Sequence, residues 1–253
     1  MKLVDTTYRP WPIPRQPWIL FMHWHDLIFM HWPIPSETIR EYIPPALTID
    51  TFDGTAWIGI VPFRMTGVRP RLVPPLPGLS AFPELNVRTY VTAEGKPGVW
   101  FFSLDAGNPV AVEAARDVFH LNYYNAKMRC TPEDDGVYYR SVRTHAQAPP
   151  AEFVGRYRPT GSVYHSTPGT LEHFLTARYC LYAADRKERV WRAEIHHARW
   201  PLQPAEAEIE RNTMTEQIRL ALPDTKPLLH FARSLDVVGW WLQRVEPATT
   251  TVT

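Results

Sequence analysis

Cysteine is scarce in this chain of 253 residues, where only Cys130 and Cys180 occur. Two cysteines do not build the disulfide framework of a secreted protein, so we expect two reduced thiols and a cytoplasmic protein. The N-terminal segment agrees with this location, because four prolines interrupt residues 1–17 and histidines break the apolar run that follows Trp18. Neither an export signal nor a membrane-spanning stretch can be built from such a segment.

An excess of charge of one sign is also missing. The net charge is +1 and neither half of the sequence is enriched in one sign, which removes the electrostatic signature of a nucleic-acid-binding protein or a polybasic membrane surface. The sequence contains no Cys-x-x-Cys, His-Glu-x-x-His, Gly-x-Ser-x-Gly or Gly-x-Gly-x-x-Gly. We therefore expect no metal ion, no cofactor, and no nucleic-acid or membrane partner. His23, His25, His31 and the pair His196–His197 are interpreted as structural histidines, because a zinc site needs three or four convergent ligands.

Proline, in contrast, is abundant. The chain has 26 prolines, and 45% of its residues are hydrophobic and 13% aromatic, which is typical of a packed chain with ordered proline-rich loops. No repeat or long linker divides the sequence. We expect a single domain over residues 1–253, with an extended proline-rich arm at 1–17 and a frayed tail at 247–253. The segment 69–83 is interpreted as a rigid loop or lid over a cavity, with docking into an aromatic groove as the alternative.

Apolar runs and turn residues predict a mainly β protein of the α+β class. Asn108 followed by Pro109 is typical of a helix start and predicts a helix that ends at Phe119. Strands are expected over residues 18–30, 55–65, 85–92 and 99–105, on both sides of a turn at 185–188, and near 237–242. Further helices are expected over residues 37–43, 169–178 and 205–211.

Polar and apolar side chains alternate along residues 82–91. In an extended strand, alternate side chains share a face. One face therefore presents a polar row, which consists of Glu84, Asn86, Arg88 and Tyr90. Two interpretations remain open: a half-exposed strand whose polar side faces water, or a ligand-binding row inside a barrel. In the second, Glu84 and Arg88 each need a counter-charge or a ligand, because an unpaired buried charge is strongly destabilising.

Several segments share the pattern of a known family. They are His31-Trp-Pro-Ile-Pro and the residues up to Gly59, then Val61-Pro-Phe-Arg-Met, then residues 82–91, and then Gly98-Val-Trp-Phe-Phe-Ser-Leu-Asp-Ala. These segments resemble the uncharacterised YqjF-type family, which is related to acetoacetate decarboxylase. The resemblance extends over roughly residues 20–245. It implies the decarboxylase-like fold, in which a bent antiparallel sheet closes into a cone or barrel around a central cavity, with a few helices outside.

The resemblance also bears on the chemistry. The segment from Ala111 to Phe119 resembles the helix that leads into the catalytic lysine pair of the decarboxylase, and Tyr123 and Tyr124 fall where the two lysines belong. Glu84 is similar in position to an active-site glutamate of that enzyme. Decarboxylation through an imine needs a neutral amine, which a phenol cannot replace. Lys127 is the one lysine near this turn, and the imine mechanism is lost unless a different register brings Lys127 into the cavity.

Three functions remain open on this scaffold. The first is an imine-independent lyase, hydratase or isomerase that acts on a carbonyl acid, with Glu84 as base and Tyr123 as acid. The second is a non-catalytic small-molecule binder or sensor, and the third is a structural or protein-contact role with side chains filling the cavity. The expected ligand is a small carboxylate or carbonyl compound with Arg88 as its charge anchor. The candidate binding residues are Asn86, Arg88, Tyr90, Tyr124, Arg64 and Arg116. A homo-oligomer is compatible with the sequence.

Overall fold

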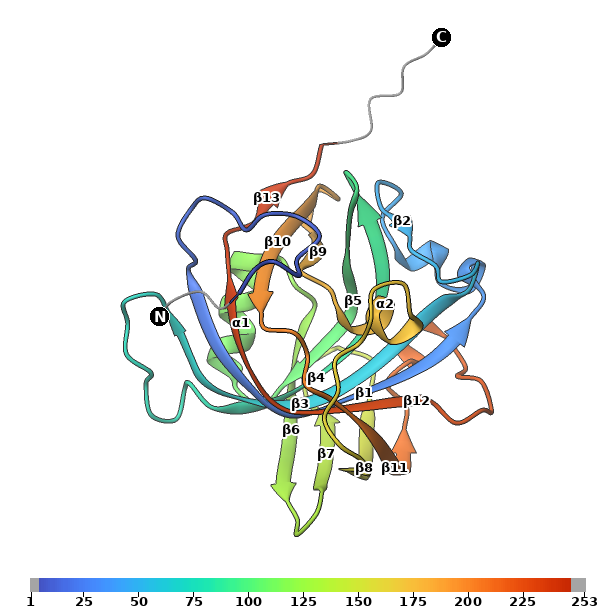
Figure 1. The fold of residues 1–253 in the computed structure, drawn as a ribbon. Helices are drawn as coiled ribbons and strands as arrows, with labels where there is room; N and C mark the ends of the chain where they lie inside the picture. Colours follow the sequence, from blue (N-terminus) through green and yellow to red (C-terminus); the bar gives the residue numbers. More distant parts are fainter. Residues whose placement is uncertain (1–4, 247–253) are drawn as a thin grey trace.

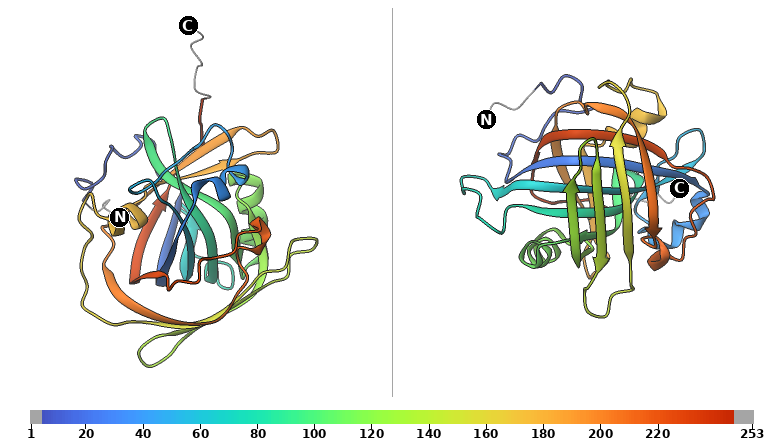
Figure 2. Two further views of the ribbon diagram at one scale, coloured as in Figure 1. Left: turned by 90° about the vertical axis from the view of Figure 1, so that its right-hand side faces the viewer. Right: turned by 90° about the horizontal axis from the view of Figure 1, so that it is seen from below.

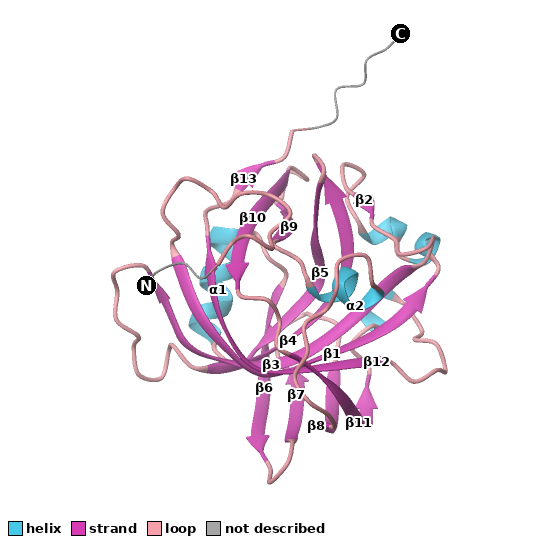
Figure 3. Cartoon of the chain, in the orientation of Figure 1, coloured by secondary structure: helices cyan, strands magenta, loops and turns pink. Residues whose placement is uncertain are grey.

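The computed structural model of the chain describes residues 5–246. Strands dominate it, and its helices are few and short (Figure 1 and Figure 3). The strands are β1 (Leu20–Ile34), β2 (Thr48–Ile49), β3 (Ala56–Pro70), β4 (Phe82–Ala93), β5 (Lys96–Ala106), β6 (Tyr123–Pro132), β7 (Val137–Arg143), β8 (Glu152–Pro159), β9 (Cys180–Ala184), β10 (Val190–His197), β11 (Leu202–Asn212), β12 (Leu228–Gly239) and β13 (Gln243–Arg244). The α-helices are α1 (Pro109–Phe119) and α2 (Leu171–Thr176), and the 3₁₀ turns are Ser36–Thr38, Arg40–Tyr42 and Glu216–Ile218. The expected frayed tail at 247–253 lies outside the described residues.

The strands belong to one sheet that closes on itself in two rings. The larger ring consists of β4, β5, β6, β7, β8, β11, β12, β1 and β3, each paired with the next, and β3 pairs back to β4. The smaller ring leaves β5 through β9 and β10 and returns through the pairing of β10 with β12. Figure 2 shows β6, β7 and β8 running across β1, β3 and β12 when the molecule is seen from below. The expected bent antiparallel sheet with ring-like closure is confirmed, although β5 pairs in parallel with β6 and β9.

Strands β3 and β4, which belong to both rings, are buried on both faces over most of their length. In β4, Leu85, Val87 and Val91 pack into one core cluster, which also contains Tyr139 and Phe153 from the larger ring. The side chains between them point to the opposite face, where the second core cluster contains Leu27, Phe29, Phe63 and Trp200. Strands buried on both faces carry nearly continuous apolar runs. This explains why the segments of β1 and β3 lack the alternation of a half-exposed strand.

The segment 205–211, expected to be a polar helix, is part of strand β11, so that prediction was wrong. Ala205, Ala207 and Ile209 pack against the first core cluster, while the glutamates between them are exposed. Two of these glutamates pair with arginines of β8, in Arg158–Glu206 and Arg156–Glu210. The period of this segment is therefore two, as in a strand, and cross-strand charge pairs stabilise it.

The other differences concern element boundaries. The helix expected over 37–43 is two 3₁₀ turns, and the helix expected over 169–178 is limited to α2. The strand expected over 237–242 is the end of β12, which stops at Gly239. Strand β1 continues to Ile34 and bends at Asp26, whose φ is 50°. The proline-rich loop is confined to residues 71–81, and its Leu72 side chain is 94% exposed.

Helix α1 forms where the Asn-Pro pair predicts it. The side chain of Asn108 accepts hydrogen bonds from the backbone N–H groups of Val110 and Ala111, at 3.0 and 3.2 Å. Pro109 occupies the first helical position, where its missing N–H has no consequence. The helix ends at His120, which is in the left-handed conformation with φ of 52°. No helix among the described residues is long and apolar enough to cross a membrane.

Candidate functional site

The polar row of β4 is buried. Glu84 is 4% exposed, Asn86 5%, Arg88 9% and Tyr90 0%. The interpretation of this segment as a half-exposed strand is therefore wrong. Because the four side chains alternate with those that pack into the first core cluster, they all point into the smaller ring.

Glu84 lies at one end of the buried row, and its partners are a phenol and an amide. The hydroxyl of Tyr123 donates to Glu84 Oε2 at 2.7 Å. Burial raises the pKa of the Glu84 carboxyl to about 7, against the lowering effect of hydrogen bonds from Tyr123 and Asn86. Burial, and then the neighbouring Glu84, raise the pKa of the Tyr123 phenol well above its usual value. A carboxyl group that titrates near neutrality beside a phenol is a pair suited to proton transfer.

Arg88 lies further along the row, and its charge has no acidic partner. Among residues 5–246, no carboxylate lies within 4.0 Å of its guanidinium. Its Nη2 donates to the backbone oxygen of Leu175 in α2 at 3.2 Å and to the Tyr90 hydroxyl at 3.4 Å. The guanidinium carbon lies 5.0 Å from the centre of the Phe29 ring. The Nε of Arg88 and the Oδ1 of Asn86 are buried without a hydrogen-bond partner in the described part of the chain.

His31 joins the buried row, although the sequence suggested a structural histidine. Its Nε2 lies 2.6 Å from the Tyr90 hydroxyl, which itself donates to Leu175 O at 2.7 Å. The Nε2 is therefore assigned as the donor to Tyr90, and Nδ1, which has no partner among the described residues, is the free acceptor. Burial, and then the charge of Arg88, lower the pKa of His31 well below its usual value, so the ring is neutral.

A glycine makes room for this part of the site. Gly59 of β3 lies between His31 of β1 and Arg88 of β4 in the sheet. A Cβ at this position would lie 3.0 Å from His31 Cδ2 and 3.4 Å from Arg88 Cγ. The imidazole and the arginine stem therefore occupy the space over Gly59 that a side chain would fill. The signal that could have identified His31 is its position two residues after Phe29, on the face that Phe29 shares with the row.

The remaining predicted residues are not part of the row. Tyr123 and Tyr124 are neighbours on β6 and point to opposite faces of the sheet. The ring of Tyr124 lies 4.1 Å from the guanidinium of Arg143. Arg143 forms a buried ion pair with Asp105 at 2.6 Å, on the face of the sheet opposite to Tyr123. Tyr123 is therefore the only member of this pair that contacts Glu84 among the described residues.

The two other arginines have local partners. Arg64 binds the carboxylate of Asp26 at 2.9 Å, and it pairs with Pro83 on the face opposite to Glu84. Arg116 of α1 donates from Nη1 to the backbone oxygen of Tyr123 at 2.6 Å. Arg116 therefore supports the strand that carries Tyr123, whereas Arg64 is separated from the row by the sheet.

Lysine is absent from the row in the described part of the chain. Lys127 is exposed on β6, and Lys187 and Lys226 are exposed as well. Lys96 forms an ion pair with Glu194 at 2.5 Å. The alternative register that would bring Lys127 into the cavity is therefore wrong. Among residues 5–246, no group of three or more His, Cys, Asp or Glu side chains is arranged to hold a metal ion.

Sequence comparison identifies a family and one similar curated protein. The model of the family DUF2071, described as "Uncharacterized conserved protein", matches residues 21–236. Uncharacterized protein YqjF of Bacillus subtilis (strain 168) is 43% identical over 232 residues, which are 92% of this chain and 95% of YqjF.

Solved structures with a similar fold have much lower identity. The enduracididine biosynthesis enzyme MppR, solved in complex with pyruvate, matches 92% of this chain with 93% of its own, at a TM-score of 0.62 and 10% identity. Acetoacetate decarboxylase from Legionella pneumophila matches 95% of this chain with 94% of its own, at a TM-score of 0.59 and 12% identity. An acetoacetate decarboxylase-like enzyme from Sphingomonas wittichii RW1 covers 92% of this chain and 95% of its own at a TM-score of 0.58. At these identities the similarity establishes the fold.

Proposed function

This chain belongs to the DUF2071 family and has the acetoacetate decarboxylase-like fold, and from this premise we propose that it binds a small carboxylate-bearing molecule in the smaller ring. The observation on which the proposal rests is the buried guanidinium of Arg88, which has a carbonyl and a phenol as partners and no carboxylate within 4.0 Å among the described residues. A buried charge of this kind is stabilised when an opposite charge binds beside it.

The unpaired atoms of the row suggest what else the ligand carries. Arg88 Nε is a buried donor without a partner among the described residues, whereas Asn86 Oδ1 and His31 Nδ1 are acceptors without one. Leaving buried polar groups unpaired costs about 1–3 kcal/mol for each group. A ligand that offers a carboxylate to Arg88 and a hydroxyl or enol to the two acceptors would satisfy all three atoms. Hydroxy acids and enolisable oxo acids have this combination.

Glu84 and Tyr123 supply a proton-transfer pair for such a ligand. Near neutral pH about half of the Glu84 carboxyl is ionised, because its pKa is raised to about 7. The carboxylate would remove a proton from the carbon next to the ligand's carbonyl, and the Tyr123 hydroxyl would donate its hydrogen bond to the developing enolate oxygen. Return of the proton at another position would give an isomerase. If the adjacent carbon carries a hydroxyl group, its departure as water, with the proton taken up by Glu84 returned to the leaving oxygen, would give a hydratase.

Binding without catalysis is the second candidate, and the spacing of the row favours it. The Cα atoms of Glu84 and Arg88 lie about 13 Å apart along an extended strand. The guanidinium of Arg88 is turned toward Tyr90, away from Glu84. A three-carbon acid held by Arg88 would therefore not reach Glu84, whereas a longer acid would.

Ligand titrations followed by NMR test the binding site. Pyruvate and the longer 2-oxopentanoate are the probes, and Arg88→Met is compared with Arg64→Met, whose guanidinium is paired with Asp26 on the opposite face. We expect Arg88→Met to weaken binding by roughly ten- to a hundredfold, as loss of hydrogen bonds to a charged group requires. Arg64→Met should bind like the wild type. If neither acid binds the wild type and native mass spectrometry finds no carboxylate retained by the purified protein, the proposed site is wrong.

Hydrogen–deuterium exchange at C3 of the same acids distinguishes the two candidates. An enzyme that removes this proton accelerates exchange in D₂O, and Glu84→Gln should abolish the acceleration while Tyr123→Phe reduces it. Binding of both acids without accelerated exchange would establish the non-catalytic candidate for these ligands.

A further inference from the structure

Two surface pockets in the described part of the chain differ in chemical character. The larger of them, of about 450 Å³, is lined by Arg158 and Arg156 of β8, which already form ion pairs with the lining residues Glu206 and Glu133. The smaller, of about 350 Å³, lies between the N-terminal arm and α2 and has no carboxylate among its lining residues. Among the residues that line it are Tyr8, Ala177, Arg199 and Trp200. We call this second pocket the arm pocket.

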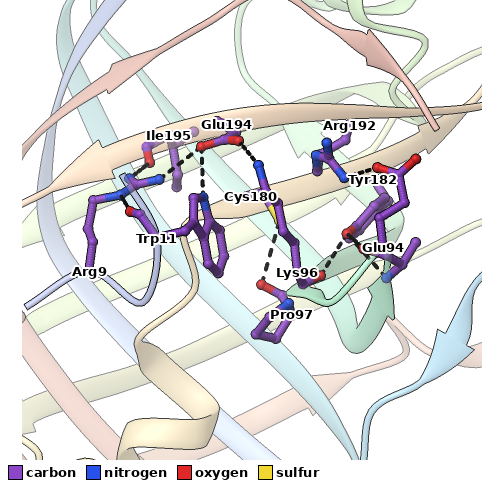
Figure 4. A network of polar contacts seen from close by, with 11 residues as sticks. Arg9, Trp11, Glu94, Lys96, Pro97, Cys180, Tyr182, Arg192, Glu194 and Ile195 are labelled. Carbon is purple, nitrogen blue, oxygen red and sulfur yellow. Dashed lines mark hydrogen bonds and ion pairs between the residues drawn. The ribbon is translucent and has the colours of Figure 1, made fainter. Parts of the chain in front are cut away.

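The arm is held in place by a buried acidic residue of β10. Glu194 accepts hydrogen bonds from Arg9 at 3.0 Å, from the Trp11 indole at 2.9 Å and from Lys96 at 2.5 Å (Figure 4). One residue before Arg9, the Tyr8 hydroxyl donates to the backbone oxygen of His197. The arm pocket therefore has a fixed outer wall rather than a loose one.

Trp200 is one of the residues that line the arm pocket, and it is 5% exposed. Its indole lies nearly perpendicular to the Phe29 ring, at a centroid distance of 4.9 Å. The same Phe29 ring lies 5.0 Å from the Arg88 guanidinium and 5.8 Å from the His31 ring. Two aromatic rings in succession therefore connect the arm pocket with the buried row.

The indole of Trp200 is held by packing alone, whereas the backbone oxygen of this residue accepts a hydrogen bond from His165 Nδ1 at 2.9 Å. The indole Nε1 has no partner in the described part of the chain, and the residue lies in the irregular segment between β10 and β11. A side chain without polar tethers changes rotamer at the expense of packing contacts alone. The α2 side of the row is less free, because Leu175 O binds both Arg88 and Tyr90.

The charge at the rim suits an anionic ligand. Arg199 is exposed at the edge of the arm pocket, and no carboxylate lies within 4.0 Å of it in the described residues. An exposed cation beside a pocket without acidic lining residues raises the local concentration of carboxylates.

We infer that the arm pocket is the entrance to the buried row, and that Trp200 is the gate through which a small carboxylate passes from the rim at Arg199 to Arg88. This inference rests on the proposed ligand site. It adds the route, and it assigns Trp200 control over the rate of entry and over the width of ligand that is admitted.

Access to the row can be measured without a ligand. In an Asn86→Cys variant, the new thiol marks the row, and 2-sulfonatoethyl methanethiosulfonate is a small anionic reagent for it. The native thiols interfere little, because burial raises the pKa of Cys130 to about 12 and of Cys180 to about 11 and the thiolate is the reactive form. Peptide mass spectrometry then gives the labelling rate of the cysteine at position 86.

The expected result is a change in opposite directions from two variants. Trp200→Ala should speed labelling by about tenfold or more, because it removes the opening step. Ala177→Phe, which fills the arm pocket from α2, should slow it. The control is Trp100→Ala, since Trp100 is a similarly buried indole, 7% exposed, in the other core cluster. The thermal unfolding of each variant is followed in parallel.

The inference is wrong if Trp200→Ala labels no faster than Trp100→Ala, or if the cysteine at position 86 is not labelled in any variant. Because this assay measures only access, its result does not depend on the pyruvate titration. If Trp200→Ala speeds labelling but no acid binds, only the proposed function is contradicted. If an acid binds but Trp200→Ala does not speed labelling, only the route through Trp200 is contradicted.

Discussion

Glu84 is a buried carboxyl group whose partners are neutral, and this makes the stability of the protein depend on pH. Its pKa rises from 4.5 to about 7 on folding. Between these values the unfolded chain releases the proton while the folded chain keeps it, so the free energy of unfolding falls as the pH rises. Glu84→Gln removes this fall in the free energy of unfolding, because glutamine does not titrate. We expect the variant to gain about 3 kcal/mol relative to the wild type between pH 4 and pH 8.

Urea denaturation at several pH values measures the difference. Glu208→Gln is the matched control, because Glu208 is exposed on β11, and its difference from the wild type should not follow this pH profile. A constant difference between Glu84→Gln and the wild type across the range would mean that folding does not change the pKa of Glu84.

At the same scale, the sequence identified part of the site. Alternation along β4 predicted that Glu84, Asn86 and Arg88 share a face, because the period of a strand is fixed by its geometry. Alternation does not say which face is buried, nor which strands lie opposite. The positions of His31 and Arg64 relative to the row could not be predicted for this reason, since they depend on pairings between strands distant in sequence.

Among the elements, α1 offers a test of local structure. Asn108 has two roles, since Oδ1 caps the helix and Nδ2 donates to the backbone oxygen of Leu79 in the proline-rich loop. Asn108→Ala removes both and should lower the free energy of unfolding by about 1 kcal/mol or more. Asn108→Asp keeps the capping oxygen and loses the donor. Denaturation of both variants separates the two roles, and equal losses would mean that the cap contributes nothing.

Sequence patterns predicted the elements that are defined by local signals, and they failed for an element whose structure depends on pairing with distant strands. The hairpin of β4 and β5 and the start of α1 were predicted because turn residues and a capping residue define them within a few positions. The segment 205–211, which was expected to be a helix, is rich in alanine and glutamate, and these residues have high helix propensity. Pairing with β8 overrides that preference, because burial of one face outweighs propensity.

For the whole molecule, the position of the described lysines predicts that the imine-forming reaction of acetoacetate decarboxylase is absent. Incubation with acetoacetate and borohydride should leave the intact mass unchanged, because Tyr123 occupies the position beside Glu84 and the described lysines lie elsewhere. Acetoacetate decarboxylase treated in the same way is the positive control. A reduced adduct on Lys127 would contradict both the structure and this prediction.

The cysteines give a second prediction at this scale. Cys130 and Cys180 are both free in the structure. Titration of the denatured, unreduced protein should count two thiols, whereas the folded protein should react slowly, because burial raises the pKa of both groups. A count of zero would reveal a disulfide that the structure does not contain.

Strand β4, which belongs to both rings, separates residues that are constrained by folding from residues that are constrained by the proposed ligand. Alternate residues of this strand lie on opposite faces, so a substitution in the row that contains Arg88 leaves Leu85, Val87 and Val91 in their core. Under the proposed function, one ligand can be exchanged for another by changes at the even-numbered positions of β4, while selection for folding acts on the odd-numbered ones. Such independence offers a physical reason why proteins that share only 10–12% of their residues with this chain retain the same architecture.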